Sequence, residues 1–350
     1  MSNFNFKLFY LPVPVRIAAV LAAVVGVGLL FTLEAPPVDV VQRGFRGLGL
    51  FQNYHPATFA KTVAENQPIA AIGSPLMVGG PAGKVYKNVQ VLKDVPVAEF
   101  TRLMASITTW VAPEQGCTYC HVDTSNLASD DLYTKRVSRR MIQMVLDINT
   151  NYKTHVAASG PTGATGVTCY TCHRGNPVPK NIWFTEPKGP AHALGNTSGR
   201  NLPSRAAGLT SLETDPFTPY FLGADDIRIT PSTALPEGTS TASFKATYWT
   251  YGVMMYMSEA LGVNCTYCHN TRQFSDWSQS SPQRATAWYG IRMVRHLNND
   301  YLVPLQSTFP PNRLGPTGDS PKIACATCHN GVYKPLFGAN MVQTYPELTK

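Results

Sequence analysis

The sequence predicts a mainly α-helical protein with extensive irregular loops, two similar halves and one apolar helix near the N-terminus. Ahead of four short cysteine motifs, apolar residues recur at intervals of three or four, as they do on helices with one buried face. The chain has 350 residues and contains 28 Pro and 27 Gly, so we expect many turns and loops between the helices.

All eight cysteines occur in pairs with the spacing Cys-x-x-Cys, and a histidine directly follows each pair. This arrangement is the attachment motif of c-type haem, in which two thiols bond the haem and the histidine binds its iron. Zinc sites, disulfides and thioredoxin-like redox pairs do not require a histidine after every second cysteine. We therefore expect four covalently bound haem c groups, attached through Cys117, Cys120, Cys169, Cys172, Cys265, Cys268, Cys325 and Cys328, with proximal ligands His121, His173, His269 and His329.

The motifs recur in the same order in two halves of the chain. Residues 116–121 resemble residues 264–269, and residues 168–175 resemble residues 324–331. This repetition indicates an internal duplication of a two-haem unit. Apolar stripes predict a helix ahead of each motif, and we expect the first helix to begin at an Asp94 cap and to end at Pro113.

These features divide the chain into six segments. Residues 35–93 show weak periodicity and predict loops with one short hairpin, and a segment rich in Pro, Gly, Ser and Thr reads as a connector between the halves. The predicted segments are an N-terminal region with a membrane anchor (1–34), a loop segment (35–93), the first two-haem unit (94–176), the connector (177–242), the second two-haem unit (243–335) and a C-terminal tail (336–350).

Residues 17–33 form an uncharged apolar run at the short end of the range for a membrane span, and residues 8–15 extend it. Lys7 and Arg16 precede the run and acidic residues follow it, which places the N-terminus in the cytoplasm and the remainder in the periplasm. A cleaved signal peptide is the alternative, but Leu33 two residues before Ala35 makes a poor cleavage site. We therefore predict a single-pass anchor in the inner membrane.

The formal net charge of +8 does not indicate a nucleic-acid partner. Each haem brings two propionates, so four haems would offset most of the excess positive charge. We expect no binding to nucleic acid.

The sixth ligands of the irons must come from the remaining side chains. Four histidines are left over, namely His55, His155, His192 and His296, and ten methionines offer a second supply. Ligation by one Met and one His raises a haem potential relative to two His ligands. Met104 and Met254 lie on the helices that lead into the first and third motifs; Met255 and Met257 compete with Met254.

The repeat distinguishes the second haem from the fourth. Aligning residues 148–152 with 297–301 pairs Met144 with Met293, which indicates a shared core position, and pairs Met141 with Gly290. Met141 is therefore the candidate ligand of the second haem, whereas the fourth haem needs another donor. We favour His155, in the loop before the second motif; the rival is His296, beside two arginines on a helix.

Together with the four motifs, several short segments resemble the tetrahaem cytochrome subunit of purple-bacterial-type photosynthetic reaction centres. The resemblance covers residues 38–345 and includes Gln-Arg-Gly-Phe-Arg-Gly at 42–47, Lys-Thr-His-Val at 153–156, the second motif at 166–175, and residues 291–294 and 298–302. It implies Met/His ligation of three haems by Met104, Met141 and Met254. It also implies that His155 binds the haem attached at Cys325 and Cys328.

The same resemblance implies a line of haems with alternating high and low potentials. Electrons would pass from a soluble periplasmic donor, a cytochrome c or a high-potential iron–sulfur protein, to the photo-oxidised bacteriochlorophyll special pair. The chain would dock on the L and M subunits, in a complex that also contains H. Many members carry lipid on an N-terminal cysteine; here every cysteine belongs to a haem motif, so the apolar helix must supply the anchor.

Two other functions fit a multihaem chain. A membrane-anchored respiratory electron shuttle would rely on bis-His ligation, which the methionine spacing argues against. A multihaem enzyme such as a nitrite reductase needs an open iron site, whereas all four haems here have a candidate sixth ligand. We therefore expect an electron carrier and no catalytic residues.

Overall fold

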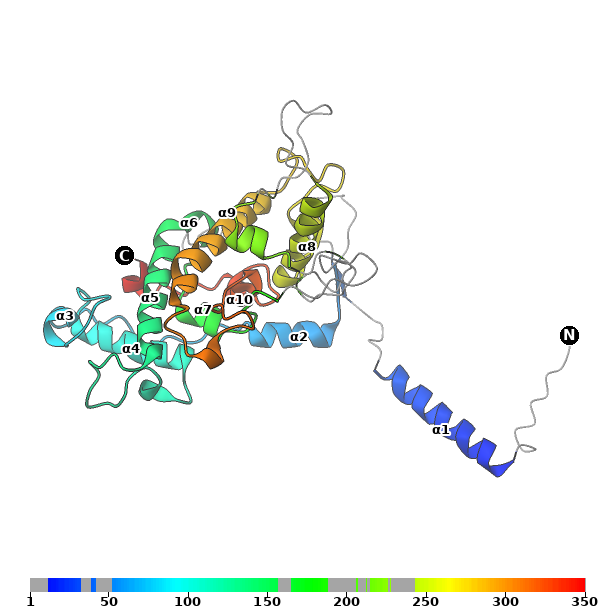
Figure 1. The fold of residues 1–350 in the computed structure, drawn as a ribbon, viewed down its shortest axis with the longest axis horizontal. Helices are drawn as coiled ribbons and strands as arrows, with labels where there is room; N and C mark the ends of the chain where they lie inside the picture. Colours follow the sequence, from blue (N-terminus) through cyan, green and yellow to red (C-terminus); the bar gives the residue numbers. More distant parts are fainter. Residues whose placement is uncertain are drawn as a thin grey trace.

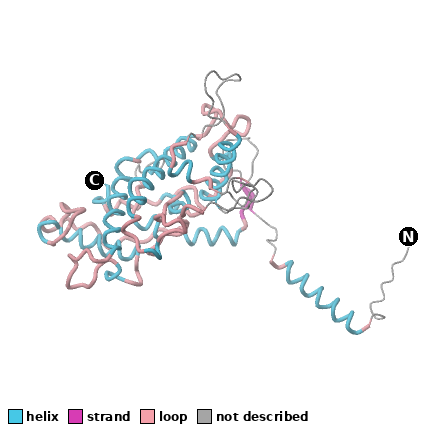
Figure 2. The backbone as a smooth tube through the Cα atoms, in the orientation of Figure 1, coloured by secondary structure: helices cyan, strands magenta, loops and turns pink. Residues whose placement is uncertain are grey.

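The computed structural model is mostly helical, which confirms the predicted mainly α-helical class, and the little sheet in its described part is one pair of short strands (Figure 2). The structure describes residues 12–32, 39–41, 52–156, 165–187, 206, 212, 215–225, 227 and 243–349.

The first helix, α1 (Val13–Leu30), stands apart from the helical body (Figure 1), and none of its residues is buried. It begins earlier than the predicted apolar run, because the proline in its first turn is compatible with a helix start. Its 18 residues are long and apolar enough to cross a membrane. Residues 1–11 and 33–38, which include the predicted cytoplasmic end, lie outside the described residues.

Between the anchor and the haem motifs, strands β1 (Asp39–Val41) and β2 (Gln52–Tyr54) pair antiparallel, as the predicted hairpin requires. Residues 42–47, part of the family resemblance, lie outside the described residues. Two helices follow that the sequence analysis missed, α2 (Pro56–Glu65) and α3 (Ala82–Val85). The end of α2 is important because the next residue, Asn66, is completely buried.

Each haem motif follows a helix, as predicted. Pro96 occupies the N-cap of the first helix and no side chain caps it, so the expected Asp94 cap is wrong. The residue before a proline favours an extended backbone, and the helix therefore begins only after Pro96. The four helices are α4 (Val97–Val111), α5 (Tyr133–Asn151), α8 (Phe244–Leu261) and α9 (Pro282–His296).

The motifs themselves lie on short helical elements. The first and third motifs form the 3-10 turns η2 (Gly116–Tyr119) and η5 (Cys265–Tyr267). The second and fourth form α7 (Cys169–His173) and α10 (Cys325–His329), which lie near the middle of the molecule (Figure 1). The remaining elements are α6 (Lys153–Val156), η4 (Thr218–Leu222), η6 (Leu297–Leu302), η7 (Val303–Leu305), η8 (Pro311–Arg313), η9 (Pro335–Gly338) and η10 (Pro346–Thr349).

Two apolar clusters hold these elements together. The larger joins α5, α8 and α9 to the π-helical turn η4, whose Tyr220 and Phe221 are buried. Part of the predicted connector therefore packs into the core, while most of that segment lies outside the described residues. The smaller cluster joins α4 to the C-terminal tail through Leu103, Trp110 and Tyr345.

Candidate haem sites

An asparagine holds the chain that leads into the second motif of each half. Asn149 donates to the carbonyl of Val167 at 2.9 Å and accepts from its N–H at 2.8 Å. In the second half, Asn298 makes the same two bonds with Ile323, at 3.0 and 2.9 Å. Val167 and Ile323 each stand two residues before a haem cysteine. Neither asparagine was predicted from the sequence, although both occupy the same place in the repeat.

The helices that carry the second motif of each half, α7 and α10, are held by equivalent hydrogen bonds. The N–H groups of Thr168 and Ala324 donate to the threonine hydroxyl three residues later, both at 3.0 Å. Beyond each motif, a glycine N–H donates to the penultimate residue of the helix before the first motif: Gly175 to Trp110 at 2.8 Å and Gly331 to Ala260 at 2.9 Å. These matched contacts dock α7 on α4 and α10 on α8.

Each predicted proximal histidine points its Nδ1 at a backbone carbonyl. The acceptors are those of Leu127, Asn176, Phe274 and Val332, at 2.9–3.0 Å. Because Nδ1 must then carry the proton, the Nε2 lone pair is left to bind a metal. Burial lowers the pKa of all four imidazoles, and the pKa of His329 falls to about 4 through burial and then through the nearby His155 and Arg174. Neutral imidazole is the form that binds iron, so these side chains fit haem.

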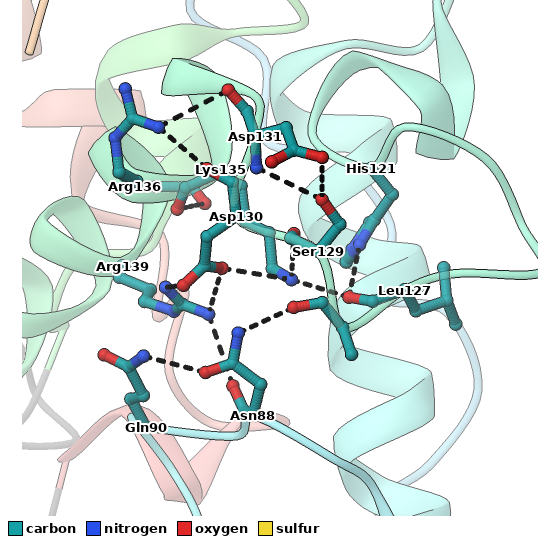
Figure 3. Close-up of polar contacts among 12 residues, drawn as sticks. Asn88, Gln90, His121, Leu127, Ser129, Asp130, Asp131, Lys135, Arg136 and Arg139 are labelled. Carbon is teal, nitrogen blue, oxygen red and sulfur yellow. Dashed lines mark hydrogen bonds and ion pairs between the residues drawn. The ribbon is translucent and has the colours of Figure 1, made fainter.

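At the first motif, the acceptor of His121 belongs to a polar network (Figure 3). The carbonyl of Leu127 also accepts from Lys135 Nζ at 2.6 Å. Lys135 contacts Asp130 at 3.3 Å, and Arg139 pairs with the same carboxylate at 2.7 Å. The Arg139 hydrogen bonds hold the pKa of Asp130 far below its usual range. The orientation of His121 therefore depends on the buried Lys135 of α5, which Asp130 and the half-buried Arg139 hold in place.

Six of the haem cysteines have free thiols, and Cys172 and Cys328 form a disulfide with their Cα atoms 4.4 Å apart. Burial raises the pKa of Cys169 and of Cys325 to about 12. These two buried thiols are therefore neutral at pH 7. One sulfur cannot form a disulfide and a haem thioether at once, so the two bonds are alternatives at Cys172 and Cys328.

His155, on α6, lies opposite the predicted proximal ligand of the fourth haem. Its ring centroid is 6.2 Å from that of His329, and its Nδ1 faces the carbonyl of Thr286 at 2.9 Å. A Cβ at Gly290 would lie 2.6 Å from Cε1 of His155. The imidazole therefore fills the space that a side chain at this position of α9 would need. Burial lowers the pKa of His155, which keeps it neutral.

The rival histidine lies in different surroundings. Nε2 of His296 faces Asp147 at 2.9 Å, and its Nδ1 lies 3.4 Å from Asp300. Both ring nitrogens of His296 therefore face carboxylates, whereas His155 faces His329. His55 has a buried Nδ1 without a partner among the described residues, and His192 lies outside them.

The candidate methionines are all half-buried. Met104 packs against the smaller apolar cluster, and Met254 against the larger one. Met141 lines a cavity of about 640 Å³, whose other lining residues include His155, His173 and His329. Cofactor sites in proteins occupy ~300–1,000 Å³, so the cavity is of the right size. Met144 and Met293 are buried in the core, as their shared place in the repeat predicts.

The comparisons with known proteins agree with this geometry. Residues 34–349 match the family model described as the photosynthetic reaction centre cytochrome C subunit. The chain is 52% identical to the photosynthetic reaction center cytochrome c subunit of Rubrivivax gelatinosus, with 95% of this chain and 90% of the relative aligned. Subunits of the same description are 49% identical in Thermochromatium tepidum (92% of this chain, 78% of the relative) and 40% identical in Roseobacter denitrificans (76% and 73%). The chain therefore belongs to the family of photosynthetic reaction centre cytochrome c subunits, the electron-transfer subunits of these complexes.

Proposed function

We propose that this chain binds four haem c groups in two pseudo-symmetric two-haem units and passes electrons from a soluble periplasmic donor to the photo-oxidised special pair. Each bound haem supplies a one-electron ferric–ferrous couple. The observation that carries the proposal is the fixed Nδ1–H of all four motif histidines, which frees Nε2 at every site. The matched contacts of Asn149 and Asn298 support the pseudo-symmetry.

The packing of the motif helices supports a linear order of sites. Helix α4 contacts α7, α7 contacts α10, and α10 contacts α8. In Figure 1, α4 and α8 lie on opposite sides of the α7–α10 pair. The proposed order is therefore first, second, fourth and third, and electrons move between neighbours in this series. Which end faces the donor is decided by how the subunit docks.

We propose Met104, Met141 and Met254 as the distal ligands of the first three haems and His155 as that of the fourth. The ring centroids of His155 and His329 lie 6.2 Å apart, and these two imidazoles would hold the fourth haem between them, each supplying a nitrogen lone pair. Gly290 provides the space for the His155 ring where the first half has Met141.

Exchange of the histidine tests this ligation. His155→Met should raise the potential of the haem attached at Cys325 and Cys328, because a thioether favours ferrous iron more than imidazole does. His296→Leu, the control, should leave all four potentials nearly unchanged. Redox titration with spectra resolved by haem distinguishes the two. A large shift from His296→Leu, with none from His155→Met, would reverse the assignment, and four bis-His spectra would exclude the methionines.

The haem count has a direct test. The intact mass under denaturing, non-reducing conditions should equal that of the chain with four haems, because thioether bonds survive unfolding. Attachment of all four also requires Cys172 and Cys328 as thioethers. A mass with two haems, together with a disulfide between these cysteines, would disprove the proposal.

The complex and its orientation complete the proposal. Association with a reaction-centre complex follows from the family; we propose docking on the L and M subunits, with H in the complex, and a cytochrome c or high-potential iron–sulfur protein as donor. Helix α1 would cross the inner membrane once, with the N-terminus in the cytoplasm and the haem domain in the periplasm. Co-purification with bacteriochlorophyll-binding subunits tests the partners, and isolation of the chain without them from intact membranes would contradict this.

A further inference from the structure

One buried asparagine connects the second and fourth haem motifs. Asn66, at the C-cap of α2, has no exposed surface. Its Oδ1 accepts from Arg174 Nη2 at 3.1 Å, and its Nδ2 donates to the carbonyl of Asn330 at 3.1 Å. Arg174 directly follows His173, and Asn330 directly follows His329. The side chain of Asn66 therefore lies where the two halves meet.

Arg174 crosses this junction. The same Nη2 donates to the carbonyl of Cys328 at 2.7 Å. Arg174 directly follows one predicted proximal ligand, and its guanidinium contacts the residue that directly precedes the other, His329. Its position is fixed by the backbone as well, since Arg174 caps α7 with φ 47° and ψ 46°. That left-handed conformation is uncommon outside glycine.

Arg174 is half-buried, and no carboxylate among the described residues forms an ion pair with it, although Glu65 attracts its charge. Its Nε is buried without a partner there, and the nearby carboxylate of Glu65 pairs with Lys180 at 3.8 Å instead. An arginine keeps its charge when buried, and burying a charge without a counter-ion is costly. The equivalent residue of the second half, Asn330, is neutral. At this position of the repeat, only the first half supplies a cation, and that cation contacts the backbone of both motifs.

We propose that Arg174, positioned by Asn66, raises the reduction potentials of the second and fourth haems together. Ferric haem carries one more positive charge than ferrous haem, so a fixed cation nearby favours the ferrous form. This inference rests on the attachment of haems at both motifs, as proposed above. Arg174 acts as a positioning and electrostatic residue at the junction through which electrons pass from one half to the other.

The test is a redox titration of the full holoprotein, resolved by haem. Over about 10 Å at an effective dielectric constant of ~20, removal of one charge changes a redox equilibrium by roughly tenfold, which is ~59 mV for one electron. Arg174→Gln should lower the second and fourth potentials by about this factor and the other two by much less. Lys180→Gln is the matched control, because it removes a neighbouring cation whose side chain is 62% exposed. It should change the potentials little.

A charge-conserving variant separates this role from a structural one. Arg174→Lys should lower the melting temperature but keep the second and fourth potentials close to wild type, and it remains informative if Arg174→Gln does not fold. A tenfold fall with lysine, no shift with glutamine, or an equal shift from Lys180→Gln would overturn the proposal. Asn66→Ala should lower both potentials in the wild-type background and neither in the Arg174→Gln background; an equal effect in both would exclude the positioning role. Intact mass reports haem loss separately.

Discussion

Gly290→Ala is the substitution that most directly tests how the fourth site is built. The new Cβ would lie 2.6 Å from Cε1, 3.0 Å from Nδ1 and 3.2 Å from Nε2 of the His155 ring. Carbon atoms make favourable contacts at about 3.5–4.0 Å, so the ring would have to move by about 1 Å. The backbone at Gly290 is helical, and alanine in a helix interior is otherwise about 1 kcal/mol more favourable than glycine.

The His155 ring has little freedom to move. Its Nδ1 is held by the Thr286 carbonyl at 2.9 Å, and the ring is packed between α9 and His329. Extra atoms in a well-packed core cost about 1–3 kcal/mol, so the variant should be less stable than wild type despite the better helix former. A metal bond of about 2 Å cannot survive a ring displacement of about 1 Å unchanged. The fourth haem should therefore change in potential, while the other three should not.

Thermal unfolding and a haem-resolved redox titration measure the two effects. Gly80→Ala is the control, since a Cβ there would meet no atom within 4 Å. It should alter neither stability nor potential by a comparable amount. A Gly290→Ala protein that is about 1 kcal/mol more stable than wild type, with an unchanged fourth haem, would refute the packing of His155 against this glycine.

Three further predictions concern Glu347 in the C-terminal tail, the hydrogen bonds between Asn298 and Ile323, and the membrane anchor. Burial, and then the nearby Glu99, raise the pKa of Glu347 to about 7. Above pH ~4.5 the unfolded state releases this proton while the native state keeps it, which stabilises the native state. The stabilisation is lost as the pH rises through 7. The free energy of unfolding of Glu347→Gln, measured with denaturant, should therefore rise by up to ~3 kcal/mol relative to wild type between pH 5 and pH 8. A difference between the two proteins that does not change with pH would contradict the raised pKa. Asn298→Ala removes the hydrogen-bond partners of both Ile323 backbone groups and should lower the free energy of unfolding by about 1–3 kcal/mol. An unchanged free energy of unfolding in denaturant would show that these bonds do not hold Ile323 in place. Replacing residues 1–34 by a cleaved signal should yield a water-soluble protein with four haems, whereas a native N-terminus near Ala35, found by mass spectrometry, would rule out a retained anchor.

The features that could be predicted from the sequence depend on residues close together in the chain. The spacing of Cys, Cys and His within five residues is local, and apolar periodicity predicted α4, α5, α8 and α9 because each buries one face. The start of α4 was placed too early because an aspartate is a good N-cap residue in general, whereas the backbone preference before Pro96 was decisive. Helix α2 spans only 10 residues and was missed, although Pro56 at its first position is a typical helix start.

The junction between the halves could not be predicted in the same way. Arg174 and Asn66 are 108 residues apart in sequence, and although Arg174 directly follows the second Cys-x-x-Cys-His motif, nothing in the sequence connects it with Asn66. Asn149 and Asn298 could be predicted in part, because the repeat places them at equivalent positions but does not reveal their hydrogen-bond partners. His155 could be selected from the sequence because the second half has Gly290 where the first half has the candidate ligand Met141, and because the family resemblance implied the same histidine.

Gly290, which stands where the first half has Met141, also makes the second half depend on the first. With glycine in place of methionine on α9, the ring beside His329 comes from α6 of the first half. The first half depends on the second in turn, since Asn149 donates to the carbonyl of Leu348 in the C-terminal tail at 2.8 Å. Arg174 adds a bond from the first half to the backbone of Cys328. Each half therefore supplies groups that complete the other, so the two halves should fold and unfold together even though each repeats the same local structure.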